Sequence, residues 1–155
     1  MGHCGREIPQ TIMFHGEYVH QIDDKNRLTL PARLRPALAA GVVLTRGLEK
    51  NIDVYPRESW DVNMARIAEL DQLTREGRAM KRFVFASAAV VEPDRQGRVL
   101  IPPHLVAHAG LDKEVVLAGV SSHLEIWDRS EWETQLSAME GSAGDVAERL
   151  AAQSG

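Results

Sequence analysis

The stretch DDKNRLTLP at residues 23–31 recurs 71 residues later as DRQGRVLIP at residues 94–102. The two copies share Asp, Arg and Pro at equivalent positions and carry apolar residues at matching places. At an offset of 72 further residues align: Val43 with Val115, Gly47 with Gly119, Val54 with Ile126, Tyr55 with Trp127, Arg57 with Arg129 and Trp60 with Trp132. A module of about 45 residues therefore occurs twice, and because so short a chain barely supports its own core, we expect one pseudo-symmetric unit.

Composition excludes several classes of protein. The chain has 155 residues, of which 44% are hydrophobic, enough for a buried core. Its mean hydropathy of −0.24 and the lack of a long apolar run exclude a membrane protein. The single cysteine, Cys4, forms no internal disulfide, and residues 1–12 hold no secretory signal, so we expect a cytoplasmic protein.

The charge is unevenly distributed along the chain. The formal net charge is −4, but residues 113–155 hold three basic and eight acidic residues, whereas residues 1–112 hold fifteen and fourteen. Basic residues cluster in 25–35 and again in 75–82, so local basic patches are expected despite the overall sign. We interpret the second cluster as the solvated face of a helix.

Each module is predicted to begin with a β-hairpin. Residues 18–22 with 27–30, and 89–92 with 98–101, favour strands on either side of a turn. Asn26 and Gly97 occupy the same place in the two turns, and both residue types tolerate positive φ. We therefore assign Asn26 and Gly97, together with Asp23 and Asp94, a structural role in the turn.

The rest of each module follows the same order in both copies. A short helix is expected after Pro31 and after Pro102, since proline suits a first helical turn. The expected helices are residues 33–40 and 104–109, and the expected second strand pairs are 42–45 with 51–55 and 115–118 with 123–127.

Helices are predicted to close each module and to link the two. The stripes Trp60, Met64, Ile67, Leu70 and Trp132, Leu136, Met139 keep helical spacing and are expected in the core, the second behind a Ser130–Glu133 capping box. The expected organisation is an extension at 1–12, modules at 13–60 and 88–136, a helical linker at 61–87 with a helix at 78–86, and a flexible tail at 137–155.

The repeated Asp-x-x-x-Arg-x-x-x-Pro motif combines structural and functional residues. Asp23 with Arg27, and Asp94 with Arg98, can pair within the turn, which accounts for the aspartates. An exposed basic tip does little to stabilise a fold, whereas the planar guanidinium group suits phosphates and base edges. We expect the arginines to contact nucleic acid.

These motifs resemble the MraZ family. The residues that carry the resemblance, over about residues 13–132, are MFHGEY at 13–18, the stretch 23–31 followed by ARLR at 32–35, DRQGR at 94–98 with Ile101-Pro102, and LEIW at 124–127. The resemblance implies a mainly β fold with α (α+β): two tandem AbrB-like swapped-hairpin β-barrel modules. Asn26 stands where the family usually has Gly, and residues 1–12 precede its usual start.

The resemblance also implies a function. Members are transcriptional regulators, usually repressors, that bind direct repeats upstream of their own division and cell-wall operon as ring-shaped homo-oligomers associated with the nucleoid. The family's DNA-contacting segments correspond to residues 23–27 and 94–98. Our candidate DNA-binding residues are Arg27 and Arg98 for base edges, with Lys25, Arg33, Arg35 and Arg95 beside them.

Two other classes of function compete with this interpretation. An enzyme or metal protein would use His104 and His108, whose i, i+4 spacing can hold one ion, but the sequence supplies no assignable third ligand and no catalytic motif. We therefore expect no catalysis, cofactor, metal ion or small-molecule substrate. The remaining alternative is a structural or partner-binding ring that does not read DNA sequence.

Overall fold

The computed structural model describes residues 13–154; the extension predicted at 1–12 lies outside the described residues. The strands are β1 (Phe14–Gln21), β2 (Arg27–Thr29), β3 (Val42–Arg46), β4 (Ile52–Pro56), β5 (Ala89–Val91), β6 (Arg98–Leu100), β7 (Glu114–Ser121) and β8 (Leu124–Asp128). The helices are α1 (Arg35–Leu38), α2 (Trp60–Ala68), α3 (Arg75–Phe85), α4 (Pro103–Ala109), α5 (Arg129–Glu140) and α6 (Ala143–Ser154), with 3-10 turns η2 (Ala32–Leu34) and η3 (Arg57–Ser59).

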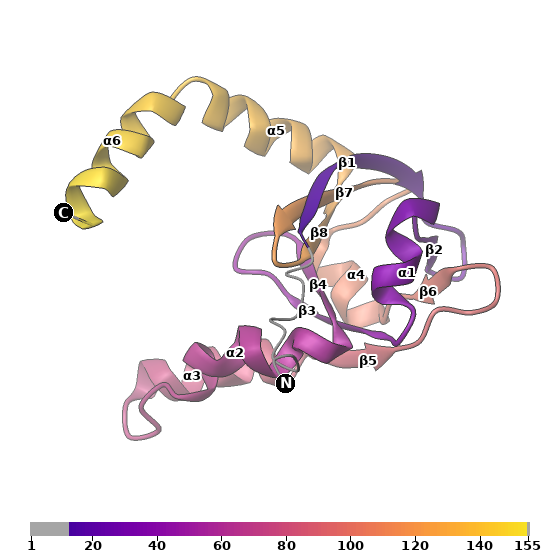
Figure 1. The fold of residues 1–155 in the computed structure, drawn as a ribbon, viewed down its shortest axis with the longest axis horizontal. Coiled ribbons are helices and arrows are strands. Elements are labelled where there is room, and N and C mark those ends of the chain that lie inside the picture. The colour runs from indigo at the N-terminus through magenta and orange to yellow at the C-terminus, as the bar shows by residue number, and fades with distance from the viewer. Residues whose placement is uncertain (1–12, 155) are drawn as a thin grey trace, which may run out of the picture.

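Strands from the two modules interleave. A six-stranded antiparallel sheet has the order β1-β7-β8-β4-β3-β5, and β2 and β6 form a separate two-stranded ribbon. The first strand of each module therefore pairs with the other module: β1 joins β7 and β5 joins β3. The strand order is symmetric about the β4–β8 pair, which confirms the predicted α+β fold and the single pseudo-symmetric unit (Figure 1).

The predicted local hairpins are wrong in their strand pairing but right in their turns. Between β1 and β2 only the bridge Ile22–Leu28 forms, because β1 pairs along its whole length with β7. The turns themselves close as expected: Asn26 has φ 62° and Gly97 has φ 77°. In each turn the residue at this position donates its N–H to the aspartate carbonyl, Asp23 or Asp94.

One hydrophobic core lies between the sheet and the ribbon. Equivalent residues of both modules fill it, each almost fully buried: Leu28 with Val99, Leu30 with Ile101, Leu34 with Leu105, and Val54 with Ile126. Burying an aliphatic side chain of this size stabilises the fold by about 1.5–3 kcal/mol. The shared core is thus the main reason that the two modules hold together.

Helices α2 and α3 form an arm that extends from the body (Figure 1). At its base Met64 and Val84 pack with Tyr55 of β4, and Trp60 joins them, as the helical spacing predicts. Thr74 caps α3 by accepting the Gly77 N–H at 3.0 Å. Leu70 lies beyond the end of α2 and is exposed, so its predicted core position is wrong.

Helices α5 and α6 form a second arm, and the segment predicted as a flexible tail at 137–155 is largely helical through Ser154 (Figure 1). The expected core stripe is also wrong: Trp132 is half-buried, Leu136 and Met139 are exposed, and neither helix has a buried residue. The capping box does not form, because α5 already begins at Arg129 and Ser130 donates its hydroxyl to Asp128. Within residues 13–154, none of the helices has the length and apolar character needed to cross a membrane.

Candidate nucleic-acid interface

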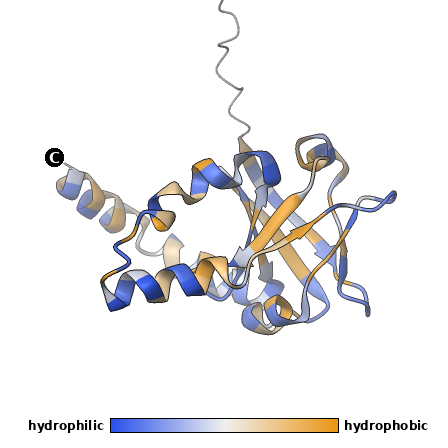
Figure 2. Ribbon diagram, turned by 90° about the horizontal axis from the view of Figure 1, so that it is seen from below, coloured by the Kyte–Doolittle hydropathy of each residue, from blue (hydrophilic) through white to orange (hydrophobic). Residues whose placement is uncertain are grey.

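The turns at residues 23–27 and 94–98 lie at one end of the molecule, opposite the two helical arms (Figure 1). Their tips are hydrophilic, whereas the strands behind them are largely apolar (Figure 2). Segments 23–35 and 94–98 together hold six cations and three aspartates. A positive end therefore exists on a protein of negative net charge, as the local clustering predicts.

Asp23 organises the first turn. Its Oδ1 accepts the backbone N–H groups of Lys25 at 2.9 Å and Arg27 at 2.8 Å, and its Oδ2 accepts Nε–H of the Arg27 guanidinium at 2.8 Å. The backbone hydrogen bond from Arg27, followed by its side-chain bond, holds the pKa of Asp23 below its ordinary value. These contacts close the turn around Asp23.

Asp94 makes the same set of hydrogen bonds in the second turn, and we call this set the aspartate lock. Its Oδ1 accepts the backbone N–H groups of Gln96 and Arg98, both at 2.9 Å, and its Oδ2 accepts Nε–H of Arg98 at 2.8 Å. The backbone bond from Arg98 is again the largest cause of a lowered aspartate pKa. Two independent stretches of chain thus build one arrangement.

The lock leaves part of each guanidinium group available. The Arg27 and Arg98 side chains are 32% and 29% exposed, and each is held at Nε only. Their Nη atoms donate to no other group in the part of the chain that the structure describes. Each arginine is therefore fixed on one side while its two terminal nitrogens remain open to a bidentate partner.

The ribbon places both arginines on one face. Thr29 lies opposite Arg98 and Arg27 opposite Leu100, while the alternate residues Leu28 and Val99 are buried in the core. Because side chains alternate along a strand and opposite residues share a face, Arg27, Thr29, Arg98 and Leu100 all point outward. We call these four residues the ribbon face.

Reciprocal hydrogen bonds join the two turns. Leu30 donates its N–H to the Gly97 carbonyl at 2.8 Å, and Ile101 donates to the Asn26 carbonyl at 2.8 Å. Arg35 adds a link, since its Nε donates to the Leu30 carbonyl at 3.0 Å and its guanidinium covers Gly97. A Cβ atom at Gly97 would lie within 3 Å of the Arg35 side chain, so a substitution there would displace Arg35.

The remaining predicted contact residues lie in the two turns and in the η2–α1 segment that follows β2. The side chains of Lys25, Arg33 and Arg95 are exposed, and none of them has a hydrogen-bond or ion-pair partner among residues 13–154. Arg35 is exposed as well but is partly engaged through Nε. Thr29 and Leu100 were not predicted, although alternation along two paired strands would have identified them once the β2–β6 pairing was known.

The rival metal pair does not converge on one site. His104 Nε2 lies 3.0 Å from the Ser87 carbonyl, and His108 Nε2 lies 3.0 Å from the Glu49 carbonyl. Each ring is therefore engaged with a different loop of backbone, and the helical spacing of the pair carries no argument for a shared ion.

The second basic cluster belongs to the arm. Arg78 donates to the Gln72 carbonyl and Lys81 to the Gln72 side chain, both on the exposed surface of the α2–α3 arm. The arm lies away from the ribbon face (Figure 1), so these cations do not extend the positive end.

Comparison with known proteins agrees with the doubled architecture. The family model described as "MraZ protein, putative antitoxin-like" matches twice, at residues 13–83 and 84–153. The chain is 44% identical over 139 residues to the transcriptional regulator MraZ of Thermomicrobium roseum, covering 90% of this chain and 98% of the relative. It is 42% identical over 139 residues to the protein of the same name in Acetivibrio thermocellus, covering 90% and 97%. The chain belongs to the MraZ family.

Proposed function

We propose that this protein is a sequence-specific DNA-binding transcriptional regulator whose ribbon face enters the major groove. The proposal rests on Arg27 and Arg98, which lie on the same face of the ribbon. An aspartate holds each of these arginines at Nε. The major groove accommodates a two-stranded β-ribbon, and arginine bonds guanine O6 and N7 in a bidentate manner. The relatives' printed name, transcriptional regulator, supports the same conclusion.

The other residues of the positive end divide into two groups. Lys25, Arg33, Arg35 and Arg95 surround the ribbon face and contact phosphates, which sets the register of the protein on the duplex. Thr29 lies opposite Arg98 and Leu100 lies opposite Arg27, and Leu100 is 55% exposed, as a contact for a thymine methyl group requires. Specificity then rests on the ribbon face and affinity on its surroundings.

Self-association into a ring brings together several copies of the ribbon face, whose small basic surface binds DNA weakly by itself. Val62 and Leu73 of the first arm and Leu136, Met139 and Leu150 of the second are exposed apolar side chains. Helices with uncovered apolar positions generally bury them against another element, and a second copy of the chain provides one. Several linked ribbon faces would then bind direct repeats with an avidity that no single copy reaches.

Membership of the MraZ family supports a proposal for the regulatory role. We propose that the ring represses and autoregulates its own division and cell-wall operon from direct repeats in the promoter, working in the cytoplasm at the nucleoid. The second candidate is a structural or partner-binding ring without specific DNA reading, which the apolar arms alone would also serve.

Fluorescence anisotropy with the DNA immediately upstream of the gene, measured against a shuffled duplex across a salt series, tests the proposal. We expect the native duplex to bind at least tenfold more tightly than the shuffled one. Arg27→Ala and Arg98→Ala should each reduce this margin, and the two together should remove it, without changing the oligomer mass. Lys81→Ala on the arm is the matched control and should bind as the parent does. Equal binding of both duplexes would contradict sequence-specific regulation, and loss of the oligomer together with DNA binding would favour the structural ring.

A further inference from the structure

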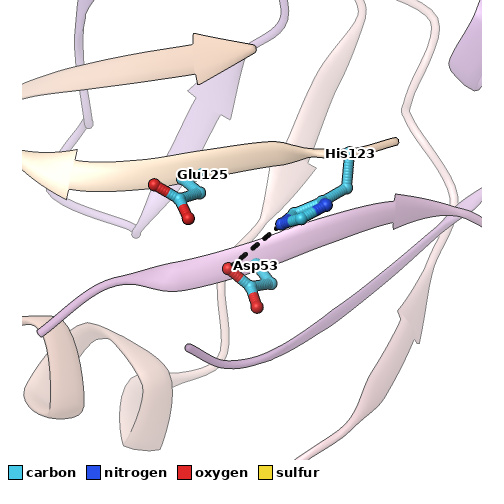
Figure 3. Close-up of side chains that lie close together, drawn as sticks. All are labelled: Asp53, His123 and Glu125. Atoms are coloured by element: carbon cyan, nitrogen blue, oxygen red, sulfur yellow. Dashed lines mark ion pairs between the residues drawn. The ribbon is translucent and has the colours of Figure 1, made fainter. Parts of the chain in front are cut away.

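A second set of chemically active side chains lies at the centre of the sheet, on the face opposite the core. Asp53 of β4 is paired directly with Glu125 of β8, and His123 stands just before β8 (Figure 3). The neighbours Ile52, Val54, Leu124 and Ile126 point into the core, so alternation turns Asp53 and Glu125 to the outer face. The pair lies where the two modules meet.

The three side chains converge. One ligand atom from each of Asp53, His123 and Glu125 lies within 4.8 Å of the other two, and His123 Nε2 is 3.6 Å from Asp53 Oδ1. Such separations approach those between ligands that share one ion at bond lengths of about 2.0–2.2 Å. The Asp53 and His123 side chains are only 18% and 15% exposed, so the set is half-buried rather than a chance surface cluster.

Each of the three side chains is oriented by a separate neighbour. Asn51 donates to Asp53 Oδ1 at 2.9 Å, and the Trp127 indole donates to Glu125 Oε1 at 2.9 Å. The Ser122 hydroxyl lies 2.9 Å from His123 Nδ1, which leaves Nε2 facing the carboxylates. Outer hydrogen bonds that fix the ligand carboxylates and the second nitrogen of a histidine are typical of metal centres.

The charges at this place are incompletely balanced. Two carboxylates face each other across adjacent strands, an arrangement that is destabilising by itself. Within residues 13–154 no Lys or Arg forms an ion pair with either of them, and His123 is the sole partner, of Asp53. A bound cation would neutralise the pair.

We propose that Asp53, His123 and Glu125 bind a divalent transition-metal ion of the Zn²⁺ class. One imidazole nitrogen with two carboxylate oxygens suits Zn²⁺ and disfavours Mg²⁺, which takes oxygen ligands only. The partial exposure of the set leaves room for water to complete the coordination. The ion would connect β4 with β8 and thereby strengthen the junction between the modules.

Equilibrium dialysis of the metal-free full-length chain against Zn²⁺, with the metal counted by mass spectrometry, tests the site. The parent for this experiment carries His3→Asn and Cys4→Ser, because histidine and cysteine side chains are residue types that bind Zn²⁺. We expect one Zn²⁺ per chain and no measurable Mg²⁺. Zn²⁺ at 100-fold excess over its Kd should raise Tm by roughly 5–10 °C.

Variants separate this site from other histidines. His123→Asn, Asp53→Asn and Glu125→Gln should each weaken Zn²⁺ binding at least about 100-fold, and the outer Ser122→Ala about tenfold. His108→Asn, whose imidazole contacts the Glu49 carbonyl, is the matched control and should bind as the parent does. Binding that survives His123→Asn in a folded variant, or no stoichiometric binding by the parent, would overturn the proposal.

A second measurement uses the parent protein alone and therefore still tests the site if these substitutions unfold the chain. Co²⁺ added to the parent should give a visible absorption band and broaden the NMR signals of the His123 ring selectively. Broadening of His104 or His108 instead, or no spectral change, would count against the site. Neither result depends on DNA binding, so the site and the proposed function fail independently.

Discussion

The two turns of this molecule share one framework and differ in what surrounds it. Asp23 and Asp94 make the same hydrogen bonds at distances that agree within 0.1 Å. The cations around the framework differ, because Lys25, Arg33 and Arg35 of the first module correspond to Gln96, His104 and Val106 of the second. The pseudo-symmetry is therefore kept where the aspartates fix the backbone and the arginines, and relaxed among the exposed side chains around them.

Removing the shared arginines should have the largest effect. Arg27→Ala and Arg98→Ala are each expected to weaken binding to the upstream duplex by about 1–3 kcal/mol, because each removes one bidentate base contact. The double variant should lose nearly the sum of these two binding free energies, since the two arginines make separate contacts from the ribbon face. Anisotropy titrations at one fixed salt concentration measure this. A double variant that binds like one of the single variants, while the other single variant binds like the parent, would show that only one module contacts DNA.

The two turn residues should respond differently to substitution. Gly97→Val is expected to destabilise the fold by about 2–3 kcal/mol, because a β-branched residue at positive φ is strained and its side chain meets Arg35. Asn26→Gly should change stability by less than about 1 kcal/mol, since glycine adopts this φ without strain. Urea unfolding measures both, and a Gly97→Val variant as stable as Asn26→Gly would contradict the backbone strain expected at residue 97.

The turn chemistry could be predicted from the sequence because it is local. Asp, Arg and a residue tolerant of positive φ within five positions define the lock, and the repeat shows it twice. The partner of each strand could not be predicted, because β1 and β2 pair with strands about 70 or more residues away, a choice that the shared core decides.

The sequence also does not show which distant residues meet in the fold, and this explains the other differences between the predictions and the structure. The stripe of Trp132, Leu136 and Met139 predicts an apolar face but not what covers it, and within one chain it stays largely exposed. Asp53 and Glu125 align at the repeat offset of 72, yet nothing in the sequence shows that they face each other until β4 pairs with β8.

The aspartate locks predict a pH dependence of equal sign in both modules. The folded-state pKa values of Asp23 and Asp94 lie below the ordinary value of about 4. Above that pH the two ionised aspartates therefore contribute fully to the stability of the fold. This contribution is lost as the pH falls through the folded-state values. We expect Asp23→Asn with Asp94→Asn to flatten the loss of stability below about pH 4 in denaturant unfolding, and an unchanged slope would contradict the lock.

Exchanging the flanking residues should produce the smallest effect. Lys25→Gln is expected to reduce the slope of log K against log salt by about 1, and Gln96→Lys to increase it by about 1, because each changes one phosphate contact. The margin between native and shuffled DNA should stay constant in both variants. A changed margin would mean that position 25 or 96 reads bases rather than phosphates.

The central claim is that Arg27 and Arg98 read base edges rather than supply charge. The most direct test is the double variant Arg27→Lys with Arg98→Lys, titrated against the upstream and shuffled duplexes across salt. Lysine keeps the charge but lacks the planar fork, so we predict an unchanged salt slope and the loss of most of the preference for the upstream duplex. A double variant that retains the full preference would contradict the account.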